Sequence, residues 1–362
     1  MAGRSKALIR AGLEALYFTG AHRALKPFFG GLGAILTLHH VRPARDEPFQ
    51  PNRLLEVTPD FLESTIMRLR RAGIDLVSLD DMLARLEGGT PDGRRFACLT
   101  FDDGYRDNLD YAWPILKRHG VPFGLYVAAN FPNGLGELWW VALERVVAGN
   151  DEVALVMDGA ERRFDTRGPE AKEAAHAAIY WWLRGLRTED ALRDAVRDLC
   201  RRHGVDIAGL PGELCMTWQE LAGLAAEPLC TIGAHTVDHV LLRKVSEERA
   251  RAEMLESAEI IEQKLGRRPR HLSYPVGDAS AAGPREFRLA AELGFATGVT
   301  TRPGVLFPEH ALQPTALPRI SLNGEFQRLR YLQVLLSGAP SALWNRLQRV
   351  NPPPHEGRQT AA

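Results

Sequence analysis

The sequence predicts an α/β fold built around a mostly parallel sheet. Short apolar runs rich in β-forming residues recur along the chain, and helical stretches separate them. Two of these runs end in groups of polar residues, and parallel folds collect such residues at the carboxyl ends of their strands. Hydrophobic residues make up 45% and charged residues 25% of the 362 residues, as in an ordinary globular protein. The length suits one large α/β domain or two smaller ones.

Seven runs are predicted to be strands: residues 34–39, 96–101, 123–128, 230–234, 271–274, 296–300 and 317–320. Two helices have clear start signals. Residues 58–72 begin with Thr58 as N-cap and Pro59 at the first helical position, and residues 246–265 begin with a serine followed by glutamates. A glycine follows each of these helices and is expected to end it.

The order of the predicted elements and the local composition divide the chain into a main domain and flanking segments. We expect the domain over residues 34–322, with a helical insertion at about 135–215. A basic amphipathic helical segment over residues 1–33 precedes it, and a helix over residues 323–350 follows it. Residues 351–362 have the composition of a disordered tail.

The N-terminal segment has an amphipathic face and a basic composition. Ile9, Leu13, Leu16 and Tyr17 fall on one side of a helix. This face suits docking onto the rest of the protein or peripheral association with an anionic membrane surface. Docking is favoured, because one short amphipathic face more often packs than binds lipid.

Composition excludes several classes of function. Lys plus Arg and Asp plus Glu are equal at 45 each, so nucleic acid is not an expected partner. The four cysteines are far apart and form no zinc-ribbon or disulfide pattern. No signal peptide or transmembrane segment is recognised, and we expect a cytoplasmic protein, acting at the inner face of the membrane if its N-terminal segment binds there.

The first motif with chemical potential is Thr100-Phe101-Asp102-Asp103-Gly104, at the end of a predicted strand. Adjacent carboxylates there can divide the work, one binding a cation and the other taking a proton from water. The alternative is a solvated turn, because Asp and Gly are common turn formers.

The second motif is His235-Thr236-Val237-Asp238-His239, after another predicted strand. On one helical turn the two imidazoles would share a face and chelate one metal. With Asp103 they would form a three-ligand site with an open position for water, the arrangement of a catalytic metal.

The two motifs together resemble those of the polysaccharide deacetylase family, whose members contain the NodB homology domain. The resemblance includes the stretch Thr217-Trp218-Gln219-Glu220-Leu221 before the second motif. It implies a distorted (β/α) barrel in which Asp102 is the catalytic base and Asp103, His235 and His239 bind one divalent metal ion. Zinc suits this ligand set best, although Co²⁺, Ni²⁺, Fe²⁺ or Mn²⁺ could occupy it.

The later motifs depart from the family pattern. Ser273 stands where the family has an arginine that orients the base. The residues after it, Tyr274, Pro275 and Val276, are the expected substrate and oxyanion contacts, and the backbone N–H of Val276 can serve as oxyanion donor. The missing arginine requires another explanation.

The last family motif normally carries a histidine as general acid, but the final strand here reads Leu317-Pro318-Arg319-Ile320. We expect His39, at the end of the first strand, to be a substrate contact or proton donor; the alternative is a histidine that only bonds backbone. Arg319 could contact a sugar hydroxyl, a carboxylate or Asp102, or be structural. Trp139 and Trp140 could stack on a sugar but are more often core residues.

These observations favour a metal-dependent hydrolase that removes N-acetyl groups from the amino sugars of a polysaccharide or lipo-oligosaccharide. The expected partner is therefore an N-acetylated glycan. Two alternatives stay open: a metal-dependent amidohydrolase that acts on a non-sugar amide, and a catalytically silent carbohydrate-binding protein. Fold and metal ligands alone do not separate the first alternative from a deacetylase.

Overall fold

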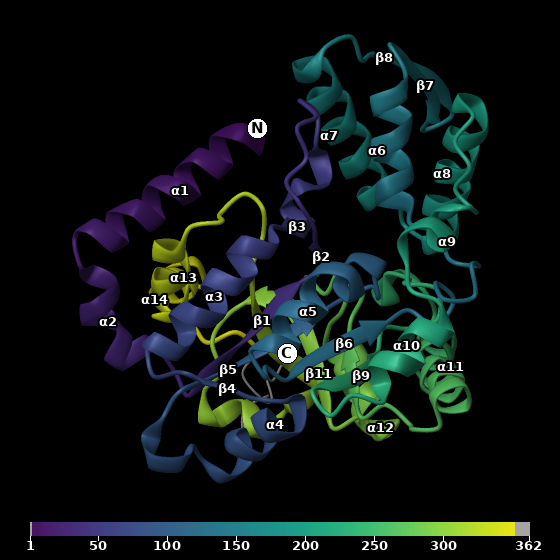
Figure 1. The fold of residues 1–362 in the computed structure, drawn as a ribbon. Coiled ribbons are helices and arrows are strands. Elements are labelled where there is room, and N and C mark those ends of the chain that lie inside the picture. Colours follow the sequence, from purple (N-terminus) through teal and green to yellow (C-terminus); the bar gives the residue numbers. More distant parts are fainter. Residues whose placement is uncertain (1, 352–362) are drawn as a thin grey trace, which may run out of the picture.

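The computed structural model describes residues 2–351 of the chain. Its centre is a closed barrel of seven parallel strands, joined in the order β1-β12-β11-β10-β9-β6-β5 and closed by pairing of β5 with β1 (Figure 1). The strands are β1 (Gly33–Leu38), β5 (Phe96–Phe101), β6 (Phe123–Val127), β9 (Cys230–Ala234), β10 (His271–Ser273), β11 (Thr297–Pro303) and β12 (Leu317–Ser321). The predicted distorted (β/α) barrel is confirmed, and all seven predicted strands are present with ends that differ by at most three residues.

Helices connect the barrel strands and cover their outer side. They are α3 (Pro59–Arg71), α4 (Leu79–Gly88), α5 (Trp113–Arg118), α10 (Trp218–Ala225), α11 (Glu247–Leu265) and α12 (Pro284–Glu292). The predicted start of α3 is confirmed, because the Thr58 side chain accepts a hydrogen bond from Phe61 N and Pro59 is the first helical residue. Ser246 caps α11 in the same way, and Gly266 follows it in the left-handed conformation.

Three short strands accompany the barrel. β4 (Asp75–Leu76) pairs with the first residues of β5, and β6 pairs with the last residues of that strand. β2 (His40–Val41) pairs with β3 (Glu56–Val57) beyond the end of β1.

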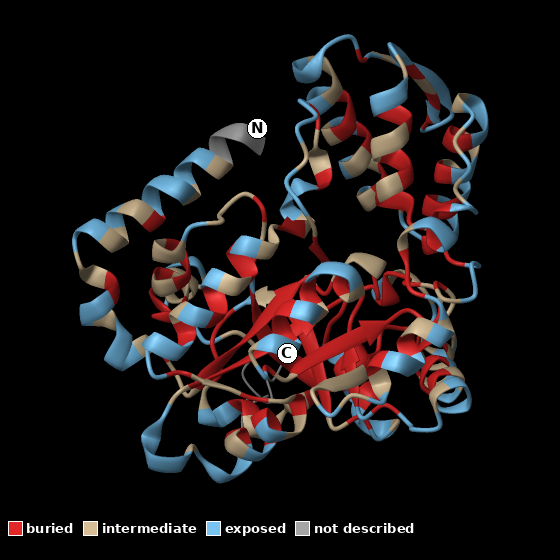
Figure 2. Cartoon of the chain, viewed as in Figure 1, coloured by how far each residue is buried: buried red, intermediate tan, exposed pale blue. Residues whose placement is uncertain are grey.

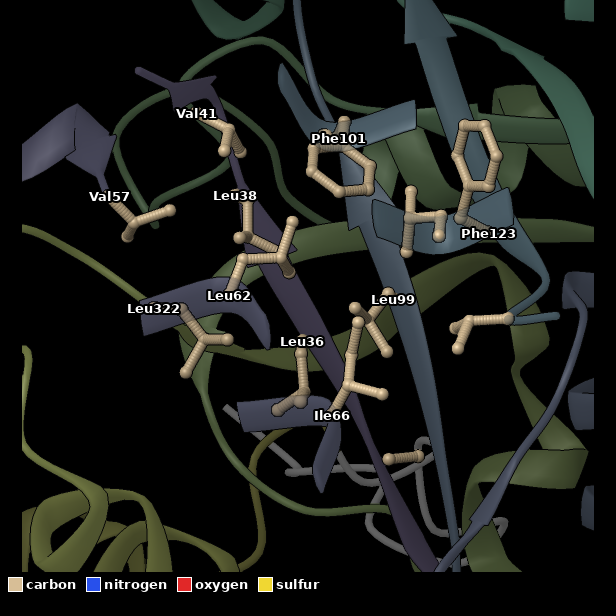
Figure 3. Close-up of a cluster of buried hydrophobic side chains, with 14 of the residues drawn as sticks. Leu36, Leu38, Val41, Val57, Leu62, Ile66, Leu99, Phe101, Phe123 and Leu322 are labelled. Carbon is tan, nitrogen blue, oxygen red and sulfur yellow. The ribbon is translucent and has the colours of Figure 1, made fainter. Parts of the chain in front are cut away.

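Successive residues of the barrel strands face opposite sides, and the two faces differ in chemistry. Leu36 and Leu38 of β1 and Leu99 of β5 pack outward against Leu62 and Ile66 of α3 (Figure 3). The alternate positions face the barrel interior. Nearer the amino ends of the strands, the interior is filled by an apolar layer. Its members are Ile35, Cys98, Tyr126, Val299 and Leu317, all buried. Further along the strands, the inward-facing residues are polar. The candidate site lies beyond them, at the carboxyl ends of the strands.

Residues 128–217 leave the barrel between β6 and α10 and include a separate cluster of helices (Figure 1). These helices are α6 (Trp139–Gly149), α7 (Pro169–Gly185), α8 (Glu189–His203) and α9 (Leu210–Leu214). The expected insertion is not purely helical, because β7 (Glu152–Met157) and β8 (Ala160–Asp165) form an antiparallel hairpin within it. Asp158 and Gly159 form its turn with φ of 52° and 81°, a conformation that Asp-Gly pairs favour.

Both ends of the described chain form helices that pack together on one side of the barrel. The N-terminal segment is two helices, α1 (Ala2–Phe18) and α2 (Ala21–Phe29), separated at Gly20 with φ of 74°. The single helix predicted over residues 323–350 is wrong, because α13 (Leu329–Leu336) and α14 (Ala339–Trp344) are separate. Gly338 causes the break. It has a φ of 72°, and a Cβ there would lie 1.7 Å from the carbonyl oxygen of Phe29. The predicted tail lies outside the described residues except for Asn351.

Candidate active site

The carboxylates Asp102 and Asp103 follow β5 and lie buried at the mouth of the barrel. Asp102 continues the inward-facing series Cys98 and Thr100, so its side chain belongs to the interior. Asp103 and Gly104 then turn the chain with φ of 72° and 69°. This turn directs the two adjacent carboxylates to different neighbours.

Asp102 is held by Arg319 of β12. The guanidinium Nη1 atom lies 2.8 Å from Oδ1 of Asp102, and Nη2 lies 2.6 Å from Oδ2, which is a bidentate ion pair. Ser273 donates a further hydrogen bond to Oδ2 over 3.2 Å. Burial raises the pKa of Asp102, but the charge and hydrogen bonds of Arg319 outweigh burial and keep this pKa below its ordinary value.

Arg319 is itself fully buried and fully paired. Its Nε atom donates to the carbonyl oxygen of Thr300, Nη1 also donates to the Thr100 hydroxyl, and Nη2 also donates to the Ser273 hydroxyl. Together with the two bonds to Asp102, these occupy all the N–H groups that a guanidinium has. Among the roles considered from the sequence, the structure shows the contact with Asp102. The arginine missing at Ser273 is thus supplied by a different strand.

Asp103 lies beside His235 and His239. Oδ1 of Asp103 is 3.3 Å from Nε2 of each histidine, and the three ligand atoms lie within 4.8 Å of one another. All three side chains are buried. Burial raises the pKa of Asp103, but the two neighbouring imidazoles hold it well below its ordinary value.

The donor atoms of this cluster fit a divalent cation. Among the described residues, Oδ1 of Asp103 has no hydrogen-bond partner although it is buried. His235 Nδ1 lies 2.7 Å from the carbonyl oxygen of Ser273 and donates to it when protonated, which leaves the lone pair on Nε2 directed at Asp103. Two imidazole nitrogens and one carboxylate oxygen are a ligand set that zinc and similar metals accept.

The segment that carries the two histidines is a loop and not the expected helical turn. Thr236 and His239 have φ of 66° and 56°, which no α-helix contains. The Thr236 hydroxyl accepts a hydrogen bond from His239 N, and Glu253 of α11 accepts bonds from the N–H groups of Val237 and Asp238. Side-chain acceptors, and not a helical ladder, therefore bring the two imidazoles together.

The insertion supports this loop from the other side. Arg193 of α8 donates to the carbonyl oxygen of Asp238 over 2.7 Å, and Glu189 accepts a bond from Leu241 N over 3.1 Å. Glu189 and Arg193 are buried and pair with each other at 3.0 Å. These two residues were not predicted from the sequence, since the one signal available is their (i, i+4) spacing on a helix.

Trp140 of α6 also reaches the site. Its ring centroid lies 4.7 Å from that of His239, and its Nε1 atom donates to the hydroxyl of Tyr105. Trp139 and Trp140 are buried in the core of the insertion, as the favoured interpretation expected. Trp140 therefore forms a wall beside His239, whereas Trp181 on the same insertion is exposed.

Comparisons with known proteins agree with this geometry. The sequence pattern of the family described as Polysaccharide deacetylase matches residues 185–297, which contain His235 and His239 but not the two aspartates. The protein YxkH of Bacillus subtilis (strain 168), whose name places it among the polysaccharide deacetylases, is 26% identical over 223 residues. The match covers 62% of this chain and 50% of YxkH, so the chain spans about half the length of this relative.

Solved structures share the fold. The deacetylase PplD of Streptococcus pyogenes superposes with a TM-score of 0.55 at 18% identity, over 83% of this chain and 97% of PplD. IcaB from Ammonifex degensii superposes with a TM-score of 0.53 at 17% identity, over 86% of this chain and 98% of IcaB. The resemblance to polysaccharide deacetylases is confirmed.

The remaining predicted site residues of this chain differ in where they lie. His39 follows β1 and is half-buried. Burial holds its pKa below the ordinary value, although the charges of Asp103 and Asp102, which lie near the imidazole, oppose this shift. Within residues 2–351 this imidazole makes no hydrogen bond, and Asn108 instead binds the His39 carbonyl oxygen. The alternative that the His39 ring only forms a hydrogen bond to the backbone therefore disagrees with the structure.

The segment Tyr274-Pro275-Val276 is only partly available to a substrate. The Tyr274 ring is buried, and its hydroxyl donates to the carbonyl oxygen of Thr315, so its side chain cannot be the expected substrate contact. Pro275 is buried as well. Val276 has a φ of 60°, and its backbone N–H has no acceptor within residues 2–351. Of the three, Val276 keeps a free donor.

Proposed function

We propose that the protein is a metal-dependent hydrolase that removes N-acetyl groups from amino-sugar residues of a polysaccharide or lipo-oligosaccharide. The observation that carries this proposal is the pair of adjacent carboxylates with separate partners. Asp102 is ionised and held by Arg319, and Asp103 lies with two histidines in a group that fits a cation. A metal-dependent amide hydrolase needs both a base for the attacking water and a cation site.

Asp103, His235 and His239 are the proposed metal ligands, and Zn²⁺ is the proposed ion, with Co²⁺, Ni²⁺, Fe²⁺ or Mn²⁺ as alternatives. When bound, such an ion polarises a carbonyl and lowers the pKa of water. His235 is oriented for this task by the carbonyl oxygen of Ser273, since that contact determines which nitrogen carries the proton.

Asp102 is the proposed general base. Both of its oxygens are fixed by Arg319, which keeps the carboxylate ionised and limits its rotation. As water attacks the acetamide carbon, Asp102 accepts the proton that the water loses. The carbon–nitrogen bond then breaks, and acetate and a free sugar amine are released.

Two further groups of the chain are assigned supporting roles. The free N–H of Val276 is the proposed donor to the oxyanion that develops on the carbonyl oxygen. His39 is the proposed donor of the proton that the departing amine nitrogen needs, because its imidazole is free and near both carboxylates.

Acetate release from N-acetylglucosamine oligomers tests the proposal. The zinc-loaded protein is expected to release acetate, and the Asp102→Asn variant to lose activity by about a hundred- to ten-thousandfold while it still binds zinc. The matched control is Asp110→Asn, which makes the same change at an exposed position. Removal of the metal with a chelator is expected to abolish the activity.

Absence of acetate despite bound zinc would contradict the proposal. In that case hydrolysis of small non-sugar amides would favour the amidohydrolase alternative. Glycan binding that is equal in the Asp102→Asn variant and in the unmodified protein, without turnover, would favour a silent binding protein.

A further inference from the structure

The helix α1 has apolar residues on two sides. The side predicted from the sequence packs inward: Ile9, Leu13, Leu16 and Tyr17 contact a cluster that includes Tyr331 and Val334 of α13. This docking is the favoured interpretation of the N-terminal segment. It occupies one face of α1. The opposite face is largely exposed, although the Phe18 ring has the Arg330 guanidinium 5.8 Å from its centroid and the Tyr17 ring edge-on beside it.

The opposite face of α1 and two neighbouring helices expose large apolar side chains. Leu8 and Phe18 of α1 are 72% and 74% exposed, and Phe28 of α2 is 73% exposed. Trp344 of α14 is 67% exposed, and two leucines beside it are also exposed. We call this set the terminal patch: Leu8, Phe18, Phe28, Leu343, Trp344 and Leu347.

The three helices of the terminal patch lie next to one another. α2 contacts both α1 and α14, and Phe28 and Leu347 line a single cleft. Figure 2 shows the outer side of α1 and α2 as exposed along the edge of the molecule. Six of the thirteen exposed large apolar side chains of the described chain belong to this patch. Such a concentration marks a surface for binding, whereas single exposed apolar residues do not.

The exposed charges on the helices of the terminal patch are basic, and the neighbouring acids Glu325 and Glu309 are paired with Lys6 and Arg349. Arg10, Arg23 and Lys26 are exposed on α1 and α2, and Arg346 is exposed just after α14. Residues 6–29 contain one acidic residue, Glu14, and residues 339–351 contain none. Glu14 is already paired with Arg330, whose Nη2 atom lies 2.5 Å from its carboxylate. The outward charge of the patch is therefore positive.

Apolar side chains with a basic fringe and no free acid match the chemistry of an anionic bilayer. Phe, Leu and Trp enter the boundary between headgroups and acyl chains, and each Lys or Arg near the surface attracts anionic headgroups. A second copy of the chain fits less well, because a symmetric contact would bring the same basic residues together. Within the described residues, no helix is long and apolar enough to cross a membrane, so the binding mode concerns the bilayer surface.

We propose that the terminal patch docks on the surface of an anionic phospholipid bilayer. Phe18, Phe28 and Trp344 enter the headgroup region, while Arg23 and Lys26 contact the lipid phosphates. The proposal does not depend on the deacetylase activity, because none of these residues belongs to the candidate active site.

Sedimentation with vesicles tests this proposal on the full chain. The protein is expected to bind vesicles of equal parts phosphatidylglycerol and phosphatidylcholine, and to bind pure phosphatidylcholine at least tenfold more weakly. The triple variant Phe18→Ser, Phe28→Ser, Trp344→Ser is expected to lose at least tenfold in partition coefficient. Binding to the anionic vesicles is also expected to weaken as salt is raised.

A matched control uses equally exposed apolar residues outside the patch. The variant Leu135→Ser, Trp181→Ser, Leu312→Ser removes side chains that are 68%, 65% and 76% exposed, and it is expected to bind like the unmodified protein. Circular dichroism checks that both variants are folded. The proposal is overturned if anionic vesicles do not bind the protein, if both triple variants bind equally, or if only the patch variant changes from dimer to monomer on gel filtration.

Discussion

The mouth of the barrel and the terminal patch place residues in opposite ways. At the barrel mouth, charged groups such as Asp102 and Arg319 are buried with 2% and 1% of their surface exposed. On the terminal patch, Phe18 and Trp344 are exposed at 74% and 67%. Both placements are unusual, because charged residues are mostly exposed and large apolar ones mostly buried.

The two regions differ in whether their unusual residues have partners. Every N–H of the buried Arg319 guanidinium is paired within the chain, so the charges of this pair need no outside partner. The exposed rings of the terminal patch have only solvent to contact on their outer side. The comparison indicates that the proposed reaction site is held in place by contacts within the chain, whereas the terminal patch needs a partner surface.

The largest effect is expected when the buried pair is broken. Arg319→Met leaves Asp102 buried without its counter-charge, and the free energy of unfolding is expected to fall by about 3–5 kcal/mol. Urea unfolding measures it, with Arg201→Met as control, because the side chain of Arg201 is 73% exposed. The double variant Asp102→Asn, Arg319→Met should recover part of the loss. Equal stability of the two arginine variants would refute the idea that this pair is a buried, interdependent unit.

The next effect concerns His176, a buried polar residue of the insertion. Burial lowers its pKa to about 4, and among the described residues its Nε2 atom has no hydrogen-bond partner. The unfolded chain takes up this proton at about pH 6.5, so the free energy of unfolding should fall from that pH downward, by about 3 kcal/mol at pH 4. In the His176→Leu variant this part of the loss should be absent.

Urea unfolding at pH 7 and pH 4 provides the measurement for His176. Each protein is compared with itself at the two pH values, so a change in packing caused by leucine does not enter the difference. An unchanged pH dependence in His176→Leu would show that this histidine is not the group that resists protonation.

A smaller effect is expected where the insertion holds the histidine loop. Glu189→Gln weakens the acceptor for Leu241 N and the pairing with Arg193, so the affinity for Zn²⁺ is expected to fall by about tenfold or somewhat more. Titration calorimetry with zinc measures it. The control Asp194→Asn lies on the same helix with its side chain 75% exposed, and it should bind zinc like the unmodified protein. If both variants bound zinc with the same affinity, the contacts of Glu189 with the histidine loop would not contribute to zinc binding.

The smallest effect belongs to the terminal patch. Leu8→Ser and Phe28→Ser are expected to change the free energy of unfolding by less than about 0.5 kcal/mol each, because their side chains are mostly exposed to solvent in the folded protein. Urea unfolding in the absence of lipid provides the value. A loss comparable to that of Arg319→Met would mean that these side chains pack against the chain in solution.

Much of the fold was predictable because the barrel strands are continuous apolar runs. Buried parallel strands are rich in apolar residues on both faces, so β5 and β9 stand out by composition and their ends were predicted to the residue. The hairpin of β7 and β8 was missed, since residues 135–215 were expected to be a helical insertion although the Asp158-Gly159 pair within them is a hairpin-turn signal. The break at Gly338 had a local signal that was not used, because a glycine followed two residues later by Pro340 commonly ends a helix.

The candidate site was predictable where motifs are contiguous and not where contacts join distant segments. Asp102-Asp103 and His235-His239 are recognisable in the sequence, and the structure brings Asp103 and both histidines together. The loop geometry at Thr236 depends on Glu253 and the insertion, which no short pattern reveals. The role of Arg319 could have been suspected from its inward alternation with Leu317, because both side chains face the barrel interior.

The bidentate contact between Arg319 and Asp102 also bears on how relatives of this protein can be found. In a closed barrel the strand ends converge, so a guanidinium can reach one carboxylate from several strands. Selection can therefore transfer a task between strands while its location in space is retained. A search that scores linear motifs will penalise Ser273 as a defect, whereas a three-dimensional template that asks only for an arginine within reach of the proposed base will accept it.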